Sequence, residues 1–268
     1  MKLFATSYRK IFADEVAEAM RTTFVPGIVT GHDIEHLPEP VQKYLRYTGA
    51  IGKEKIHSVR LEFTGDFKTA PDRKCLKFSS LQYNFYDDPR RFFYMKMPMM
   101  GVPLDGLHVY KNERATMNIR IANLFEFVDA RGEKMDQGET VTVFNDLCLM
   151  APAALIDADI QWQTIDSLTV KATYTNGRNT ISAKLYFNED GELINFISTD
   201  RFLSSNGKTY QSYPWSTPAK NYIEFNGRKV PSYGEAIWHM PEGDYIYGKF
   251  NLKSIEYNGG SFTTGIKL

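Results

Sequence analysis

The alternation of hydrophobic and polar positions is clearest in the middle of the chain. Apolar side chains occupy every second position over residues 168–174 and again over 181–187, which is the period of a strand with one buried face. The pair Asn176-Gly177 lies between these runs and tolerates the positive φ angles of a two-residue hairpin turn. A second turn at residues 188–191 leads into a third run. The pattern therefore predicts a three-stranded antiparallel meander.

The same two-residue period covers much of the chain on either side of the meander, so we expect about a dozen strands in all. A turn signal at residues 103–106 precedes one of them, and Asn226-Gly227 is a second hairpin turn. The remaining strands are predicted at residues 56–65, 74–79, 81–86, 91–96, 107–110, 115–121, 124–128, 210–215, 221–225, 236–240 and 245–257.

Three stretches follow the three- and four-residue spacing of amphipathic helices instead. The first covers residues 8–24 and ends before Pro26-Gly27. The second covers residues 37–49; its prolines are tolerated in a first helical turn, and Gly49 suits the left-handed position that ends a helix. The third, residues 139–150, lies between two long runs of strands and ends before Pro152.

These elements predict an α+β protein with a strongly curved, mainly antiparallel sheet, an open or half barrel with helices packed in its concave face. Long open sheets curl, and a curled sheet leaves an interior that helices or a ligand can fill. No linker, repeat or low-complexity stretch divides the chain, so residues 1–268 are expected to form a single domain. Residues 1–49 are its helical segment, and residues 56–258 are its sheet with one inserted helix near 139–150.

The composition agrees with a well-packed core, because 43% of the 268 residues are hydrophobic and 14% are aromatic. Basic and acidic residues number 32 each, so no long-range attraction to nucleic acid is expected. Cys75 and Cys148 are far apart, which favours two buried thiols in a reducing compartment. Unless the natural N-terminus is longer, the absence of a signal peptide and of a long apolar run predicts a cytoplasmic protein without stable membrane insertion.

One segment has an unusual composition of methionine and aromatic residues. Phe93, Met95, Met97 and Met99 lie within a predicted strand and the loop that follows it. Methionine adapts its shape to irregular apolar partners, so this segment could line a pocket for a hydrophobic ligand. The alternative is an ordinary core strand followed by a packed loop.

Two pairs of polar residues are candidates for chemistry. Asp105 and His108 could form a hydrogen-bonded acid–base pair, although an aspartate in a turn commonly bonds to its own backbone. Asp200 and Arg201 are neighbours, so on a strand they point to opposite faces. An inward Asp200 would have a raised pKa unless a base such as Arg228 were near. It could act as a general acid or base or hold a polar ligand head, or it could simply cap a turn.

The remaining candidates lie near the C-terminal end of the sheet. Glu235 is either a binding carboxylate beside Trp238 at a pocket mouth or an exposed strand residue. Trp215 and Trp238 serve mainly as core anchors that could also border a ligand, because a buried tryptophan removes a large area from water. The spacing of His32 and His36 can suit a metal, but no third ligand is apparent. We therefore expect no metal and no cofactor.

Several motifs resemble a bacterial family of uncharacterised proteins, a domain of unknown function with an LPEPVxRYL-type signature. The similar segments are LPEPVQKYL at residues 37–45, DG at 105–106, MDQGE at 135–139, DR at 200–201, PW at 214–215, NGRKVP at 226–231 and GEAIW at 234–238. A looser likeness of fold links the chain to lipoprotein-carrier half-barrels of the LolA/LolB type. That likeness implies a curved sheet that encloses helices and an apolar cavity.

The leading hypothesis is a protein that binds or carries a hydrophobic small molecule or lipid in the interior of its sheet. The alternative is an uncharacterised enzyme, for example a hydrolase, in which Asp105, His108, Asp200 and Arg201 converge. The sequence has no nucleophile elbow, phosphate-binding loop or dinucleotide fingerprint, so the common enzyme motifs give this alternative no support. The oligomeric state is open.

Overall fold

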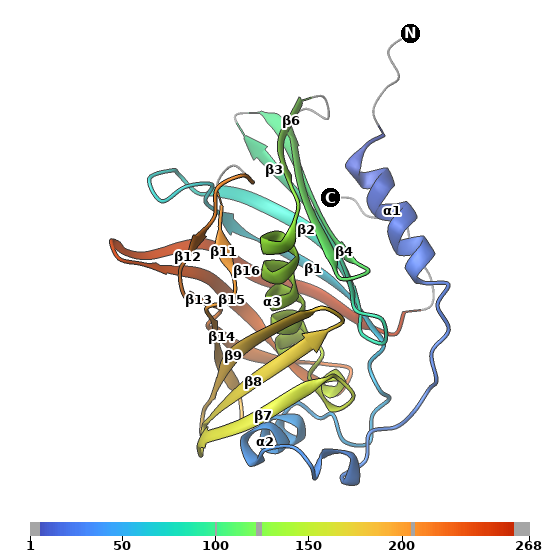
Figure 1. Ribbon diagram of the computed structural model, residues 1–268. Coiled ribbons are helices and arrows are strands. Elements are labelled where there is room, and N and C mark those ends of the chain that lie inside the picture. The colour runs from blue at the N-terminus through green and yellow to red at the C-terminus, as the bar shows by residue number, and fades with distance from the viewer. Residues whose placement is uncertain (1–5, 100, 122–124, 205–206, 260–268) are drawn as a thin grey trace.

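The protein is an antiparallel sheet that bends around one central helix (Figure 1). The structure, a computed structural model, describes residues 6–99, 101–121, 125–204 and 207–259. Within them, fourteen strands form one sheet in the order β6-β5-β4-β3-β2-β1-β16-β15-β13-β10-β9-β8-β7, and β14 pairs with β15. The sheet ends in two different edge strands, β6 and β7, and is therefore open. The predicted α+β half-barrel is confirmed.

One half of the sheet, here called the N-terminal arm, consists of strands that follow one another both in sequence and in space. They are β1 (Ser58–Phe67), β2 (Leu76–Phe85), β3 (Arg90–Met99), β4 (Val102–Lys111), β5 (Arg114–Ile121) and β6 (Phe125–Ala130). β2 is one continuous strand where two were predicted. Residues 103–106 lie within β4, so the turn predicted there is wrong. The actual turn between β4 and β5 is made by Asn112 and Glu113, which both have positive φ.

The other half, the C-terminal arm, contains the predicted meander, which the register confirms. Tyr174 pairs with Ile181 across the Asn176-Gly177 turn, and Phe196 pairs with Leu185 across the next turn. The strands of this arm are β7 (Ile160–Asp166), which was not predicted, β8 (Thr169–Asn176), β9 (Asn179–Phe187), β10 (Leu193–Ser198), β13 (Trp215–Ser216), β14 (Ala219–Phe225) and β15 (Arg228–Met240). β11 (Phe202–Leu203) and β12 (Gln211–Ser212) form a separate two-stranded sheet.

The last strand joins the two arms. β16 (Gly243–Tyr257) pairs with β15 along one side and with β1 along the other, so the C-terminal strand fills the centre of the sheet. Its side chains contribute Leu252 and Ile255 to the main core. The two arms also meet across the open side through their turns. Asn176 Nδ2 donates to the hydroxyl of Tyr110 at 2.8 Å, and Asn179 Nδ2 donates to the carbonyl of Glu113 at 2.8 Å.

Helix α3 (Glu133–Met150) fills the concave face and is the element around which the sheet curves. Most of its residues after Gln137 are buried, because it has sheet on several sides. It begins six residues before the predicted start at Glu139. A short 3-10 helix η2 (Pro152–Ile156) continues from it and is also mostly buried.

The other two long helices lie at different places. α2 (Glu39–Tyr47) packs against the core below α3, and its Tyr44 hydroxyl donates to the carbonyl of Cys148 at 2.7 Å. Gly49 after it has φ +70°, as predicted. A 3-10 helix η1 (His32–Ile34) precedes α2. α1 (Tyr8–Ala19) packs on the face opposite α3, against β2, β3 and β4, so the concave face holds α3 but not α1.

Candidate functional site

The candidate site is a buried layer of polar side chains between α3 and the concave face of the sheet. It starts from Glu139, Thr142 and Asp146, which recur at three- and four-residue steps and so share one side of α3. Apolar residues such as Val141 and Phe144 are also buried on this helix. A helix that is buried on all sides thus carries one polar stripe, and the stripe faces the groups described next.

Arg91 of β3 is held by two carboxylates of this stripe. Its Nε donates to Asp146 Oδ2 at 2.7 Å, and its Nη1 donates to Glu139 Oε2 at 3.4 Å. Burial by itself would lower the pKa of the guanidinium, but the two carboxylates outweigh burial and raise it. Asp146 also accepts hydrogen bonds from Gln82 Nε2 at 2.6 Å and Asn84 Nδ2 at 3.2 Å. These contacts fasten α3 to the N-terminal arm.

Glu139 is the centre of the layer, with an exposed side-chain fraction of only 3%. Besides Arg91 it meets His108 Nδ1 at 3.2 Å and, at the longer distance of 3.9 Å, Arg201 Nη2. Burial pushes the pKa of this carboxyl upward, but Arg91, His108 and Arg201 together lower it to about 2. We call Arg91, His108, Glu139, Asp146 and Arg201 the Glu139 cluster. When the imidazole of the cluster is neutral, the two positive charges of its arginines equal in number the two negative charges of its carboxylates.

Arg201 differs from Arg91 because hydroxyl groups and rings, rather than a close carboxylate, surround it. Its Nε donates to Thr142 Oγ1 at 3.1 Å and its Nη1 donates to the Tyr247 hydroxyl at 3.0 Å. The guanidinium carbon lies 4.5 Å from the ring centroid of Trp215 and 5.4 Å from that of Trp238. Such contacts attract a cation to the face of an aromatic ring. The side chain retains 16% exposure.

The predicted methionine segment lies next to this cluster. Phe93, Met95 and Met97 share a strand face with Arg91, because alternate residues of β3 point to the same side. All three are at most 7% exposed and belong to the main core. Gly106 on β4 lies opposite Met95 and leaves room for its methyl group. The side chain of Met99 and all of Met100 lie outside the described residues.

The structure separates the predicted acid–base pair. Asp105 and His108 are both in β4 and are three residues apart, so their side chains point to opposite faces of the sheet. His108 points to Glu139, whereas Asp105 accepts a hydrogen bond from Tyr94 OH at 3.2 Å on the side of α1. The proposed pairing of Asp105 with His108 is therefore wrong, and so is the convergence of all four polar candidates.

The second predicted pair has the opposite arrangement from the one expected. Asp200 lies in a bend after β10 and accepts from the backbone nitrogen and hydroxyl of Ser182 at 2.7 and 3.2 Å. Its carboxylate thus bonds to strand β9 just beyond the end of β10, and Arg201 is the residue that enters the interior. Glu235 is half-buried on β15 and accepts from the Tyr233 hydroxyl at 2.6 Å, away from the Glu139 cluster. Trp215 and Trp238 are buried beside Arg201.

Sequence reasoning missed Arg91, Glu139, Asp146 and Tyr247. A signal for two of them was present in the helix, because polar residues at 139, 142 and 146 form a stripe within an apolar segment. Arg91 also has the strand parity of Phe93, which places a charge on a buried face. No pattern in the sequence indicated that Tyr247 lies in the polar interior. Its role depends on the pairing of β16 with β15, which brings it to Arg201 and to Trp215 Nε1 at 3.1 Å.

A second constellation, on the other face of the sheet, resembles the relay of a serine hydrolase. Ser216 Oγ lies 2.8 Å from His239 Nε2, and His239 Nδ1 lies 2.7 Å from Asp244 Oδ1. In a hydrolase the serine must be open to the substrate carbonyl. Here Asp244 has a 60% exposed side chain, whereas Ser216 is 1% exposed. The relay therefore ties β13 to the β15–β16 hairpin and offers no accessible nucleophile.

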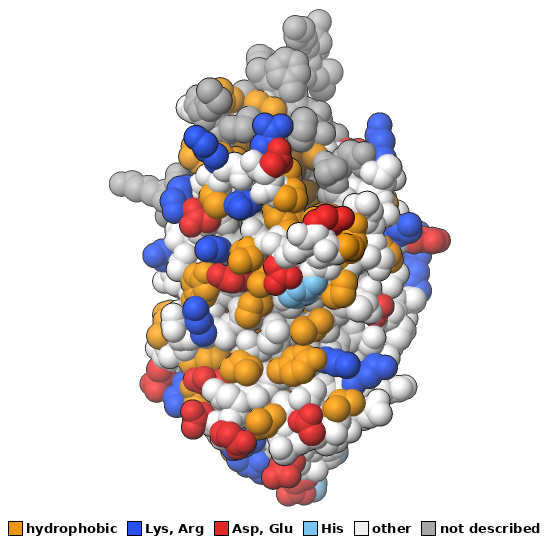
Figure 2. Space-filling view, turned by 90° about the vertical axis from the view of Figure 1, so that its left-hand side faces the viewer, with side chains coloured by type: hydrophobic (Ala, Val, Ile, Leu, Met, Phe, Trp, Pro, Cys, Tyr) orange, Lys and Arg blue, Asp and Glu red, His pale blue; other side chains and the backbone are white. Residues whose placement is uncertain are grey.

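The surface seen in Figure 2 carries acidic and basic side chains interspersed with apolar ones, without a region of a single sign. Within the described residues, no helix is long and apolar enough to span a membrane. The same residues contain no group of three or more His, Cys, Asp or Glu side chains placed to hold a metal ion. Among the described residues, the Glu139 cluster brings two arginines, a histidine and two carboxylates together in the interior of the sheet.

These features define an open antiparallel half-barrel with a central helix and a buried polar cluster. The chain belongs to the family of unknown function DUF6544, whose family model matches residues 27–250. This match confirms the family assignment expected from the motifs, but a family of unknown function does not indicate an activity for the chain. A comparison with curated proteins gave no match.

Two solved structures are similar in fold. One is the crystal structure of a domain from Vibrio parahaemolyticus, described as that of an outer membrane lipoprotein-sorting protein. It is 8% identical, with a TM-score of 0.47, and the match covers 85% of this chain and 93% of that chain. The other is a LolA superfamily protein from Nitrosomonas europaea, 10% identical, with a TM-score of 0.43 and coverage of 82% and 94%. These likenesses concern the fold alone.

Proposed function

We propose that this protein binds a hydrophobic small molecule or lipid that carries one acidic group, on the concave face of the sheet beside α3. The acidic group binds Arg201, and the apolar part lies against neighbouring aromatic and methionine side chains. The observation that carries the proposal is the environment of Arg201. Its hydrogen bonds within the described residues go to two hydroxyl groups, and its nearest carboxylate is 3.9 Å away.

The geometry suits an anion because Glu139 is already engaged elsewhere. Arg91 and His108 lie closer to Glu139 than Arg201 does, at 3.4 and 3.2 Å. Of the three basic side chains around Glu139, Arg201 therefore interacts most weakly with the shared carboxylate. A guanidinium presents several N–H donors in a plane and can hold a carboxylate or phosphate through two bonds. Trp215 and Trp238 keep it in place and provide apolar surface beside the bound head group.

The apolar part of the ligand takes space that core side chains occupy in this structure. Met95 and Met97 are 5% and 1% exposed, so a ligand has to displace or reorient side chains around them. Methionine is unbranched and changes rotamer at low cost, which suits a surface that packs on itself when empty and on a ligand when loaded. In the described part of the sheet, β6 and β7 are not paired with each other, so only contacts such as those between the turns hold the arms together along the open side.

Native mass spectrometry on protein purified without detergent, followed by solvent extraction, tests the proposal directly. We expect an apolar acid to be recovered with the wild-type protein across independent preparations. A quantitative probe is 8-anilinonaphthalene-1-sulfonate, which has fused rings and one sulfonate. Its affinity should fall at least about tenfold in Arg201→Gln, because a hydrogen bond to a charged group contributes about 1.5–3 kcal/mol. Arg201→Lys, which keeps the charge, should lie in between.

The matched control is Arg178→Gln. Arg178 is a half-exposed arginine in the β8–β9 turn that contacts Glu113 at 3.7 Å, outside the Glu139 cluster. Its substitution should leave the affinity for the probe unchanged. Equal binding by the wild type and by folded Arg201→Gln, together with no extracted acid, would reject the proposed function.

A further inference from the structure

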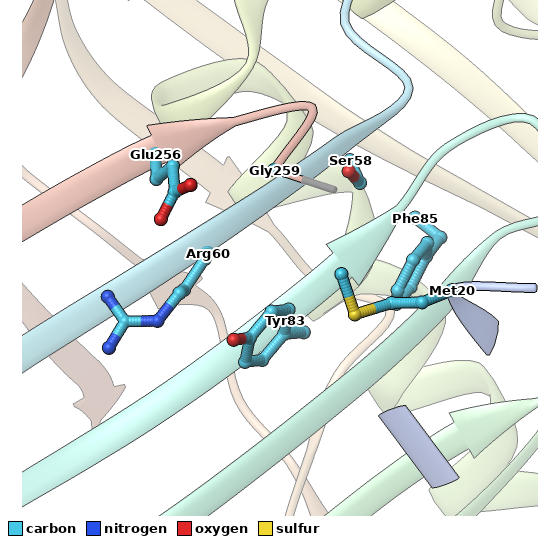
Figure 3. A pocket seen from close by; sticks show the side chains of 7 residues that line it. All are labelled: Met20, Ser58, Arg60, Tyr83, Phe85, Glu256 and Gly259. Atoms are coloured by element: carbon cyan, nitrogen blue, oxygen red, sulfur yellow. The ribbon is translucent and has the colours of Figure 1, made fainter. Parts of the chain in front are cut away.

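A groove on the α1 side of the sheet is separate from the Glu139 cluster. It lies where residues 19–24, which end α1 and follow it, cross the start of β1 and the end of β2, and it encloses about 140 Å3. Figure 3 shows the smaller recess that continues it, between Met20 and Phe85 on one side and Arg60 and Glu256 on the other. The two hollows share Met20, Ser58, Phe85 and Gly259.

His57 is one of several polar residues that line this groove. Its Nδ1 lies 2.9 and 2.8 Å from the two carboxylate oxygens of Asp87, and the ring of Phe24 stacks on the imidazole with a centroid distance of 4.2 Å. The other ring nitrogen, Nε2, is buried and has no hydrogen-bond partner among the described residues. The His57 side chain is 10% exposed. A buried polar atom without a partner is unfavourable unless water or a ligand bonds to it.

The contact with Asp87 decides what kind of partner fits. A carboxylate accepts, so the Nδ1 of a neutral imidazole carries the proton and Nε2 carries the lone pair. Nε2 then requires a donor such as a hydroxyl group. The neighbouring charges disfavour an anion, because Asp87 is half-exposed in the groove and Arg90 is already paired with Asp88 at 2.9 Å through Nε. An anionic ligand is therefore disfavoured, and the apolar walls described next suit a neutral one.

The size and walls of the groove restrict the ligand further. A protein cavity of about 150 Å3 holds one benzene molecule, so 140 Å3 matches a single six-membered ring. Met20, Phe24 and Phe85 supply apolar and aromatic surface for the faces of such a ring. Phe24 is 43% exposed and lies outside regular secondary structure, so its side chain can swing away from His57 and admit a ligand.

We propose that this groove is a second binding site, for a neutral single-ring compound with a hydroxyl group that donates to His57 Nε2. Asp87 holds the imidazole in the accepting tautomer, and Phe24 covers the occupied site. The inference does not depend on the proposed function, because the groove and the Glu139 cluster share no residue.

Phenol and toluene form a matched pair of probes, since they differ by a hydroxyl in place of a methyl group. Both would be titrated into the wild-type protein by NMR with 15N-labelled histidine. We expect phenol to bind at least about tenfold more tightly and to move the Nε2 resonance of His57, whereas the resonances of His239 stay unchanged. His57→Phe should abolish the preference for phenol, because it keeps the ring stack but lacks the nitrogen.

His32→Phe is the control, since the side chain of His32 is 89% exposed and does not line the groove. It should retain the wild-type preference. If His57→Phe does not fold, the wild-type Nε2 resonance decides alone. The proposal is overturned if phenol and toluene bind the wild type equally, if phenol binds without moving that resonance, or if folded His57→Phe still prefers phenol.

Discussion

Glu139 is a carboxyl group that folding removes from water and nevertheless keeps ionised. An isolated buried carboxyl would be protonated, and only the cations around this one reverse that tendency. Its pKa of about 2 in the folded protein, against an ordinary value of 4.5, makes it a group whose charge stabilises the native state. In the same arrangement Arg201 lies 3.9 Å from Glu139 and has no closer carboxylate among the described residues. The Glu139 cluster therefore contributes to the stability of the protein and also provides the proposed binding group for an acidic ligand.

The pH dependence of unfolding should reveal Glu139. Because its pKa is lower in the folded state, the unfolded chain binds the proton first, and the stabilisation is lost as the pH falls from about 4.5 to about 2. At 1.36 kcal/mol per pKa unit, the ionised Glu139 contributes about 3 kcal/mol to the free energy of unfolding. Glu139→Gln should be less stable than the wild type at pH 7, and its unfolding free energy should fall less steeply over that range in urea titrations.

Glu133→Gln changes an exposed glutamate of the same helix and should keep the wild-type slope. An equally steep loss of stability in Glu139→Gln would show that other groups account for the acid sensitivity.

For individual residues, the sequence indicated which polar side chains lie in the interior better than it indicated which of them contact one another. His108 and Arg201, two of the polar residues singled out in the sequence, lie in the Glu139 cluster, whereas their neighbours in the two predicted pairs, Asp105 and Asp200, lie elsewhere. The error for Asp105 comes from placing a turn where β4 continues, because two residues in a turn can meet and two residues three apart on a strand cannot. The true partner, Glu139, comes from a helix distant in sequence, and no local pattern specifies that contact.

The elements themselves follow the sequence more closely. The meander and the Asn226-Gly227 hairpin are found where alternation and turn residues predicted them. The elements that differ include β7, which was not predicted, and α3, whose first six residues were missed. Residues 133–138, EKMDQG, contain a single large apolar side chain, Met135, and a glycine, so they lack the apolar periodicity that reveals an amphipathic helix.

Strand β1 contains a glycine that the pairing with β16 requires. A β-carbon on Gly65 would lie 1.7 Å from the carbonyl oxygen of Lys249 and 2.8 Å from the ring of Phe78. Backbone cannot yield as a flexible side chain does, so Gly65→Ala should lower the unfolding free energy by about 3 kcal/mol, measured by chemical denaturation.

Gly31→Ala is the matched substitution, because nothing lies within 4 Å of a β-carbon there and its φ is −61°. It should change stability by less than about 0.5 kcal/mol. Equal effects of the two substitutions would mean that β1 and β16 are not as close as described.

Across the whole molecule, the two arms depend on a few polar contacts where their turns meet. Asn179→Ala removes the bond to the Glu113 carbonyl and should cost about 1 kcal/mol. Hydrogen exchange should then become faster in both turns together, around residues 112–113 and 176–179, and remain slow in the β1–β16 pair. Asn118→Ala loses a bond to Asp129 within one arm and is the control, with no effect on the β8–β9 turn. If hydrogen exchange became faster only in the mutated turn, this result would contradict the coupling of the two arms.

The place of β16 in the sheet has a consequence for synthesis on the ribosome. Residues 243–257 are synthesised after both halves of the sheet, yet they fill the slot between β1 and β15. Until then each nascent half exposes an unpaired edge strand, the kind of surface that joins wrongly to other chains. A chaperone that shields those edges until β16 has been synthesised would therefore raise the yield of native protein, and truncation before residue 243 would leave two halves joined by α3 and by the contacts between their turns, without the strand that pairs with both.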